Sequence, residues 1–194
     1  MKEIIKISIK SSLYNRKRTL TFHQDYIEFD ENDFKFNKEN ISGFKFGVKW
    51  INGYSFTFGR IYCIDIINNE GIVIKIRLKS IYKINIKLLT EKYFKIISLL
   101  EEYYFDDISR KHLENFSNEI PFKINDIEFT KEGISFNNKF IFWEDLLTKN
   151  YTNYYSLSSK SNSSVYVLTD YMNDWNGAVL YSVTRMILKS KELL

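Results

Sequence analysis

The sequence offers two histidines, a single cysteine and scattered carboxylates as candidates for acid–base or nucleophilic chemistry. His23 stands two residues before Asp25, and an imidazole beside a carboxylate is the arrangement that a general base needs. His112 and Asp65 would join such a site only if folding brought them together. Cys63 lies in an apolar, strand-like segment with no base near it in sequence, which disfavours a thiolate nucleophile. We expect structural roles for all of these residues, and an enzyme with an unfamiliar site remains an alternative.

Short motifs that mark common catalytic and cofactor sites are absent from the sequence. It has no Gly-x-x-x-x-Gly-Lys phosphate loop, no Gly-x-Gly-x-x-Gly turn, no His-Glu-x-x-His helix and no Gly-x-Ser-x-Gly elbow. One cysteine cannot form a paired-thiolate zinc site. The acidic stretch Asp30, Glu31 and Asp33 lacks the spaced oxygen ligands and the glycine of a calcium loop, so we interpret it as a solvated turn. We therefore predict no cofactor and no metal.

A row of cations follows one face of a predicted strand. Lys75, Arg77 and Lys79 alternate with apolar residues, and Lys83 and Lys87 continue at the same parity. Five cations on one surface would attract phosphate, acidic lipid head groups or an acidic protein, and each contributes about 1 kcal/mol near an anionic bilayer. The competing interpretation is an ordinary solvent-facing strand whose lysines prevent aggregation.

Two predicted loops carry large aromatic side chains. Trp50 and Tyr54 flank one turn, and Tyr171, Asp174 and Trp175 lie in a polar loop near the end of the chain. Aromatic residues at loop tips are enriched among the side chains that dominate protein–protein binding energy. The alternative is that these rings fold back over the adjacent sheet.

These residues depend on elements that the hydrophobic periodicity predicts. Over most of the first eighty residues, apolar side chains recur at every second position between turn residues, which is typical of antiparallel strands. Asn52-Gly53 separates two such runs and predicts a hairpin with a type I′ turn. A second hairpin joins residues 62–67 to 72–78. The period then lengthens to about 3.6, which predicts an amphipathic helix over residues 87–105 and a second helical stretch that ends near residue 118.

We place a domain boundary near residue 118 because the pattern of the first unit recurs after it. Leu20–Phe22 and Tyr26–Phe29 align with Ile127–Phe129 and Gly133–Phe136 at a constant offset. This indicates an internal duplication, with two unrelated meanders as the alternative. The chain is thus divided into a meander-plus-helix unit at 1–118 and a shorter unit at 119–194, which has room for about five strands before a terminal helix.

The composition is that of a foldable, core-forming chain: 194 residues, 44% apolar, with 28 basic and 24 acidic side chains. Residues 1–118 hold 20 basic and 15 acidic side chains. This excess is too small to indicate a nucleic-acid surface, so nucleic acid is not an expected partner. The first ten residues alternate apolar and polar side chains instead of forming a signal-peptide core, and we expect a cytoplasmic location.

Residues 129–136 (FTKEGISF) and 140–146 (FIFWEDL) form an apolar strand, a turn, a strand and an aromatic–acidic run. Together with the recurring meander-plus-helix order, they resemble the pleckstrin-homology-like (PH-like) domains of bacteria over about two thirds of the chain. The resemblance implies a β-rich α+β fold in which antiparallel meander sheets form partly open barrels, each followed by an amphipathic helix. It also implies a binding scaffold, used in that family for lipids, peptides or proteins.

From these features we predict a non-enzymatic protein-binding module that acts as an adaptor, an inhibitor or an immunity-type protein. The aromatic loops would supply its contact residues. The main alternative is peripheral binding to anionic membrane lipids through the basic residues. A homodimer formed through exposed sheet edges is a further alternative.

Overall fold

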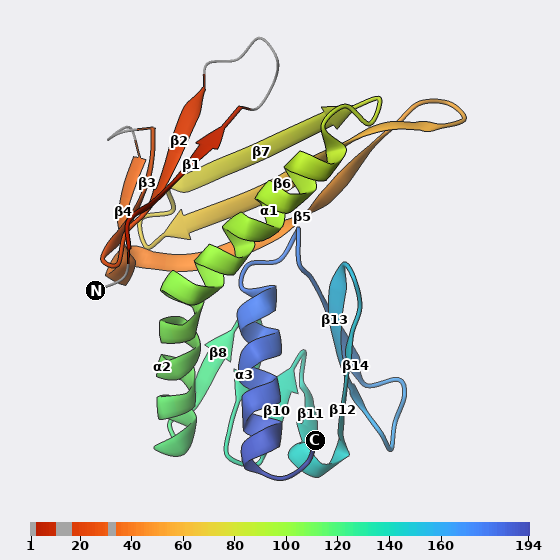
Figure 1. The fold of residues 1–194 in the computed structure, drawn as a ribbon. Coiled ribbons are helices and arrows are strands. Elements are labelled where there is room, and N and C mark those ends of the chain that lie inside the picture. Colours follow the sequence, from red (N-terminus) through yellow and green to blue (C-terminus); the bar gives the residue numbers. More distant parts are fainter. Residues whose placement is uncertain (1–2, 11–16, 31–33) are drawn as a thin grey trace. The chain divides into compact units, whose positions relative to one another are not determined.

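The computed structural model describes residues 3–10, 17–30 and 34–194, and it divides the chain into two compact units. Unit 1 is Met1–Tyr104 and unit 2 is Phe105–Leu194. The boundary expected near residue 118 lies after helix α2 (Asp106–Ser117), whereas the structure divides before it. The reason is packing, because α2 lies beside α3 (Gly177–Ser190), which belongs to unit 2 (Figure 1).

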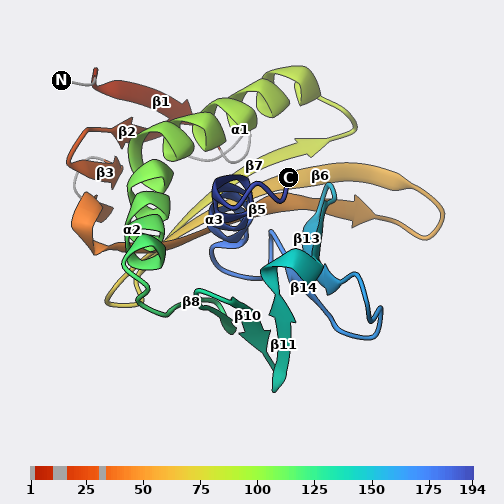
Figure 2. The ribbon, with the colours of Figure 1, turned by 90° about the horizontal axis from the view of Figure 1, so that it is seen from below.

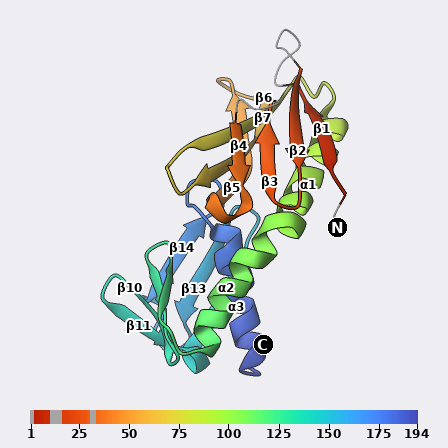
Figure 3. The same cartoon turned by 90° about the vertical axis from the view of Figure 1, so that its left-hand side faces the viewer.

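The described part of unit 1 consists of two antiparallel sheets and a helix. Four short strands pair in chain order, three longer strands form the second sheet, and α1 runs along β7 (Figures 1 and 2). Figure 3 shows the four short strands side by side. The elements are β1 (Ile5–Ile9), β2 (Arg18–Phe22), β3 (Tyr26–Phe29), β4 (Phe34–Asn37), the short 3-10 helix η1 (Lys38–Asn40), β5 (Ile41–Asn52), β6 (Thr57–Asn68), β7 (Val73–Ile81) and α1 (Ile86–Leu100).

Burial alternates along β7 as the periodicity predicts. Ile74, Ile76 and Leu78 are buried, while Lys75 and Lys79 are exposed. The apolar face of this sheet packs on α1, whose Tyr93 ring lies 5.1 Å from the ring of Tyr62 on β6. The charged side chains of β7 therefore lie on the opposite face of the sheet.

Unit 2 has the same order of sheets and terminal helix as unit 1, preceded by α2. A π-helical turn (Glu101–Phe105) leads from α1 into α2. The elements that follow α2 are β8 (Phe122–Ile124), β9 (Ile127–Phe129), β10 (Gly133–Phe136), β11 (Lys139–Phe142), the 3-10 helix η3 (Trp143–Asp145), β12 (Leu146–Asn150), β13 (Tyr154–Ser159), β14 (Tyr166–Asp170) and α3. Unit 2 thus has seven strands, and the expectation of about five was wrong. Strands of three residues such as β8 are too short for alternation to reveal them.

Trp143 anchors the core of unit 2. Its indole is buried, its Nε1 donates to the carbonyl oxygen of Thr130 at 3.1 Å, and its ring lies 6.0 Å from that of Phe129. Val183 and Ile187 of α3 are buried in the same cluster. The hydrogen bond lets a large amphipathic ring pack without leaving its N–H unsatisfied.

The predicted hairpin at Asn52-Gly53 is present, but its turn differs from the expected one. β5 continues through Asn52, which pairs with Thr57, and neither Asn52 nor Gly53 has a positive φ. The loop is Gly53–Phe56, closed by a 2.8 Å hydrogen bond from the Gly53 N–H to the Phe56 carbonyl oxygen. A four-residue loop needs no type I′ geometry, so the type I′ prediction was wrong.

At the coarse level, the predicted β-rich α+β fold with antiparallel sheets is confirmed. None of the helices within the described ranges has the length and apolar content needed to cross a membrane.

Candidate functional site

Large apolar side chains gather in the solvent at one end of unit 1. The β5–β6 hairpin extends past the turn that joins β7 to α1 (Figures 1 and 2). Six residues of the hairpin, this turn and the first turn of α1 are at least half exposed: Trp50 50%, Tyr54 111%, Phe56 64%, Tyr82 72%, Ile84 54% and Leu88 58%. We call these six residues, with Phe58, Arg60 and Lys83, the hairpin end. Contiguous exposed apolar surface marks a site of interaction with a protein or a membrane.

Ring contacts connect the hairpin to the β7–α1 turn. The rings of Phe56 and Phe58 lie 6.1 Å apart, and those of Phe58 and Tyr82 lie 6.2 Å apart. The guanidinium carbon of Arg60 stands 4.4 Å from the centre of the Trp50 ring. Phe56, Phe58 and Tyr82 therefore form one group of contacting rings, and Trp50 and Arg60 form a stacked pair.

The β7–α1 turn is held in a costly backbone conformation. Tyr82, Lys83 and Asn85 have φ values of 49°, 61° and 56°, in the left-handed region that side chains other than glycine rarely adopt. The Tyr82 N–H donates to the Phe58 carbonyl oxygen at 2.7 Å, and the Ser80 hydroxyl donates to the Ile84 carbonyl oxygen at 2.9 Å. Strain of this kind concentrates at functional sites.

A small pocket of about 150 Å³ opens between the hairpin and the turn. The side chains of Trp50, Phe58 and Ile86 give it apolar walls, and Arg60 and Lys83 bring two cations to it. Thr57, Gly59 and Ser80 complete the lining. Within the described part of the chain, no carboxylate pairs with either cation. The pocket is therefore electropositive.

The surrounding sequence reinforces that charge. Residues 41–64 and 71–90 contain eight basic side chains and no acidic one. Asp65 and Glu70 are the acidic residues between these two ranges. Asp65 neutralises Arg77 of this set, and the remaining excess of basic side chains favours an anionic partner and makes binding dependent on salt.

The structure places the residues of the predicted basic stripe in three different segments of unit 1. Lys75 and Lys79 are exposed on the face opposite α1, as expected, but the strand ends at Ile81. Lys83 therefore lies in the following turn and Lys87 on α1, so neither continues the strand face. The register extends the basic face across the sheet instead, because Lys45 and Lys75 both lie opposite Asp65 on β6, and Lys49 and Lys79 both lie opposite Ile61.

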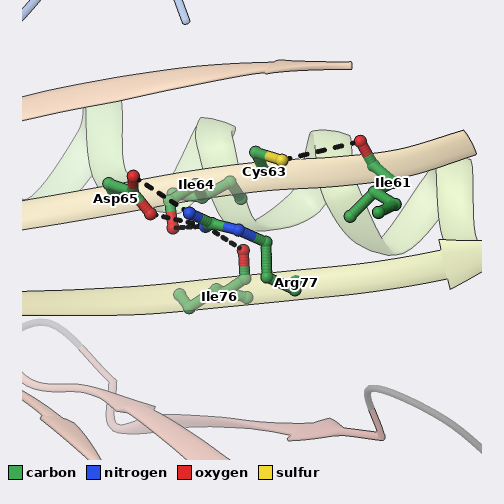
Figure 4. A network of polar contacts seen from close by, with 6 residues as sticks. All are labelled: Ile61, Cys63, Ile64, Asp65, Ile76 and Arg77. Atoms are coloured by element: carbon green, nitrogen blue, oxygen red, sulfur yellow. Dashed lines mark hydrogen bonds and ion pairs between the residues drawn. The ribbon is translucent and has the colours of Figure 1, made fainter. Parts of the chain in front are cut away.

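Arg77 is not a free cation, because Asp65 neutralises it (Figure 4). Its two terminal nitrogens lie 2.5 Å and 3.1 Å from the two carboxylate oxygens of Asp65. Cys63 lies beside this pair in the figure, and burial raises the pKa of its thiol. The geometry thus gives Asp65 and Arg77 a structural role and supports no thiolate chemistry at Cys63.

The aromatic loop of unit 2 is a folded cap and not a projecting tip. The Asp174 carboxylate accepts a hydrogen bond from the Asp170 N–H at 2.8 Å, and the Tyr171 hydroxyl donates to the Asn150 side chain at 2.6 Å. Burial raises the pKa of Tyr171, and Trp175 is half-buried. Of the five predicted contact residues, only Trp50 and Tyr54 have the exposure that the prediction requires.

The histidines occupy separate local settings. His23 lies in the β2–β3 turn of unit 1, where its Nδ1 accepts the Asp25 N–H at 3.1 Å and its ring stacks on Tyr26 at 4.4 Å. His112 belongs to unit 2, where its ring packs 4.8 Å from Phe122 and burial lowers its pKa. These contacts account for both residues as parts of the fold.

The acidic stretch is described only at its first residue. Asp30 pairs with Arg18 at 2.8 Å, and Glu31 and Asp33 lie outside the described residues. Across the residues that are described, no three His, Cys, Asp or Glu side chains are grouped as a metal site would require.

Sequence reasoning missed most of the hairpin end. Phe56, Phe58, Arg60, Tyr82 and Ile84 were not singled out, because alternation alone gives them no special status. The absence of carboxylates over residues 41–64 and 71–90 is the signal that could have identified the region.

Comparison with known proteins found no match: no family model, no curated protein and no solved structure is detectably similar to this chain.

Proposed function

We propose that the chain is a non-enzymatic binding protein whose unit 1 docks on an anionic membrane surface through the hairpin end. The observation that carries this proposal is the combination of six exposed large apolar side chains with two cations, Arg60 and Lys83, that pair with no carboxylate among the described residues. Tryptophan and tyrosine favour the membrane–water interface, where the ring is apolar on one side and hydrated on the other. Lysine and arginine add about 1 kcal/mol each beside anionic lipids.

The projecting shape of the hairpin supports insertion. Tyr54 lies at the tip of the loop, fully exposed, and Phe56 is close behind it. Burying one such ring in an apolar environment contributes about 1.5–3 kcal/mol. Lys49, Arg60 and Lys83 would then lie at the level of the lipid head groups, where their charge need not be desolvated. This membrane surface would be the cytoplasmic one, in keeping with the location expected from the sequence.

The proposal includes a PH-like character and an internal duplication. Each unit has a four-stranded meander, a three-stranded meander and a terminal helix. β4 and β11 have the same burial pattern, and each precedes a 3-10 turn and a buried aliphatic residue, Ile41 or Leu146. The helices α1 and α3 both follow an asparagine in the left-handed conformation, Asn85 or Asn176. These shared details are more specific than alternation and support a duplicated scaffold.

Co-sedimentation with lipid vesicles tests the proposal. The protein should bind vesicles that contain phosphatidylserine and not vesicles of pure phosphatidylcholine, and binding should fall as salt rises. The double variant Tyr54→Ser/Phe56→Ser should bind at least tenfold more weakly at every salt concentration, because it removes the inserting rings. Lys83→Gln/Lys87→Gln should bind about thirtyfold more weakly at low salt, because it removes two cations.

Matched variants in unit 2 control for general changes in surface properties. Phe142→Ser/Tyr166→Ser removes side chains that are 59% and 54% exposed, and Lys123→Gln/Lys189→Gln removes two exposed cations. Neither control should alter vesicle binding. Binding that ignores the acidic lipid content, or that falls equally in the controls, would disprove the proposal.

An acidic protein partner is the second candidate function. The stacked pair Trp50–Arg60 favours it, because tryptophan, tyrosine and arginine dominate the residues that contribute most to protein interfaces. Under this hypothesis the chain acts as an adaptor, an inhibitor or an immunity-type protein. It predicts no vesicle binding, together with a stoichiometric complex whose partner is lost in Trp50→Ala.

A further inference from the structure

We infer that the pocket between the β5–β6 hairpin and the β7–α1 turn is a binding site for a phosphate group. The inference rests on the proposed function for its biological source, a phosphomonoester lipid head group, but the pocket chemistry can be tested without a membrane. Two cations, Arg60 and Lys83, line a space of about 150 Å³ that has an indole as one wall.

Hydrogen bonds within the protein leave only some donors of the pocket available to a ligand. The Thr57 hydroxyl donates to the Asn52 side chain at 2.7 Å, and the Ser80 hydroxyl donates to the Ile84 carbonyl oxygen at 2.9 Å. Both hydroxyl protons are thus engaged within the protein. Arg60 and Lys83 both line the pocket, and among the described residues neither has a hydrogen-bond acceptor. Apart from the indole N–H of Trp50, the side-chain donors of the pocket that remain available are cationic, which suits an oxyanion.

The protein positions both cations. Stacking on Trp50, with the guanidinium carbon 4.4 Å from the ring centre, fixes the plane of the Arg60 guanidinium. A planar guanidinium presents paired N–H groups that match two phosphate oxygens. Lys83 is presented by a left-handed backbone, with φ of 61°, inside a turn that is hydrogen-bonded to the hairpin through Tyr82. Preorganised donors of this kind favour a ligand with several acceptor oxygens.

Phosphate is favoured over a simple hydrophobic ligand by charge and by the setting of the pocket. No acidic side chain occurs in residues 41–64 or 71–90 to neutralise the site. The half-exposed ring of Trp50 lines the pocket, and the apolar part of a lipid would continue along it from the head group. A phosphomonoester supplies more charge and more free oxygens than a phosphodiester, so it is the expected head-group chemistry.

A titration followed by nuclear magnetic resonance tests the pocket on the intact protein with inorganic phosphate as the probe. The side-chain N–H signals of Arg60 and Trp50 should shift together and saturate. Arg60→Gln and Lys83→Gln should each weaken phosphate binding by about tenfold, whereas Lys79→Gln, on the strand face outside the pocket, should not. Each variant's backbone spectrum reports whether it is folded. Shifts spread over the basic strand face, or none up to tens of millimolar phosphate, would overturn the inference.

Vesicles distinguish the source of the phosphate. At matched surface charge, vesicles with phosphatidic acid should bind more tightly than vesicles with phosphatidylserine, and Arg60→Gln should abolish that preference while Lys79→Gln preserves it. Equal binding of the two lipids, with inorganic phosphate still shifting Arg60, would support the pocket as a site for a soluble phosphate compound and overturn the lipid source. Phosphate binding without any vesicle binding would support the pocket and contradict the proposed membrane docking.

Discussion

Lys83 lowers the stability of the fold through its backbone conformation and contributes a cation to the pocket. Its left-handed backbone costs about 1–2 kcal/mol for a residue with a Cβ atom. Glycine adopts the same conformation without that cost but makes the unfolded chain more flexible. A lysine at this position therefore costs folding free energy, and it places a positive charge at the pocket.

We expect Lys83→Gly to raise the free energy of unfolding by about 0.5–1 kcal/mol while weakening vesicle binding. Urea denaturation and co-sedimentation on the same preparation would measure both. Lys83→Ala serves as the control, since it removes the charge and keeps the backbone cost. A Lys83→Gly protein that is less stable than the Lys83→Ala protein would contradict the strain argument.

His112 is a group through which the stability of unit 2 depends on pH. Burial lowers its pKa, and its Nδ1 is buried with no hydrogen-bond partner among the described residues. The folded state therefore favours the neutral imidazole, so the unfolded state binds more protons once the pH drops below the unfolded pKa of about 6.5. The stability that depends on neutral His112 is fully present above that pH and is lost as the pH falls toward the lower folded pKa.

We predict that the wild-type protein loses more unfolding free energy than His112→Leu when the pH is lowered from 7.5 to 5. Above pH 7 the two stability curves should run parallel. Urea denaturation across this range checks both statements, and an equal loss in the two proteins would show that other groups control the acid response.

At the scale of elements, the β5–β6 hairpin depends on one close approach of backbone. A Cβ atom at Gly59 would lie 2.6 Å from the carbonyl oxygen of Ser80, on the neighbouring strand. A Cβ atom at Gly53, in the loop of the same hairpin, would meet nothing nearer than 3.6 Å. Only the first glycine is therefore required by packing.

Gly59→Ala should lower the free energy of unfolding by about 1–3 kcal/mol, because backbone must move to admit the methyl group. Gly53→Ala should change it by less than about 0.5 kcal/mol. Thermal or urea denaturation of the two variants makes the comparison, and similar losses in both would mean that the strand spacing at Gly59 is not as tight as described.

The elements also show where sequence reasoning succeeded and where it failed. The strands of the second sheet in unit 1 were predictable because β6 and β7 are long and one face is buried, so alternation persists over many residues. The prediction that Lys83 and Lys87 continue the basic face was wrong, because side chains alternate between two faces only within a strand and β7 ends at Ile81. Lys83 lies in the turn that follows, and Lys87 lies on α1. The Arg77–Asp65 pair joins residues twelve apart across two strands, and alternation does not reveal which diagonal contacts form.

On the scale of the whole molecule, the two units share an order of elements but not a surface chemistry. Unit 1 has 18 basic and 12 acidic side chains, and unit 2 has 10 and 12. The outer face of β5–β7 bears Lys75 and Lys79, whereas β12 and β14 of unit 2 expose Leu147 and Leu168. Unit 1 therefore has the net positive charge that attraction to an anionic surface requires, and unit 2 does not. Membrane docking should therefore depend on unit 1 alone.

The most direct test of membrane docking is the depth of Trp50, measured through quenching of tryptophan fluorescence by lipids brominated along their acyl chains. Trp143 is buried and Trp175 is half-buried, so quenching on vesicle binding should come mainly from Trp50. We predict strong quenching by bromines near the head groups, weak quenching by bromines near the chain ends, and loss of both in Trp50→Phe. Vesicle binding without quenching, or quenching that survives Trp50→Phe, would contradict the proposal that the hairpin end enters the membrane.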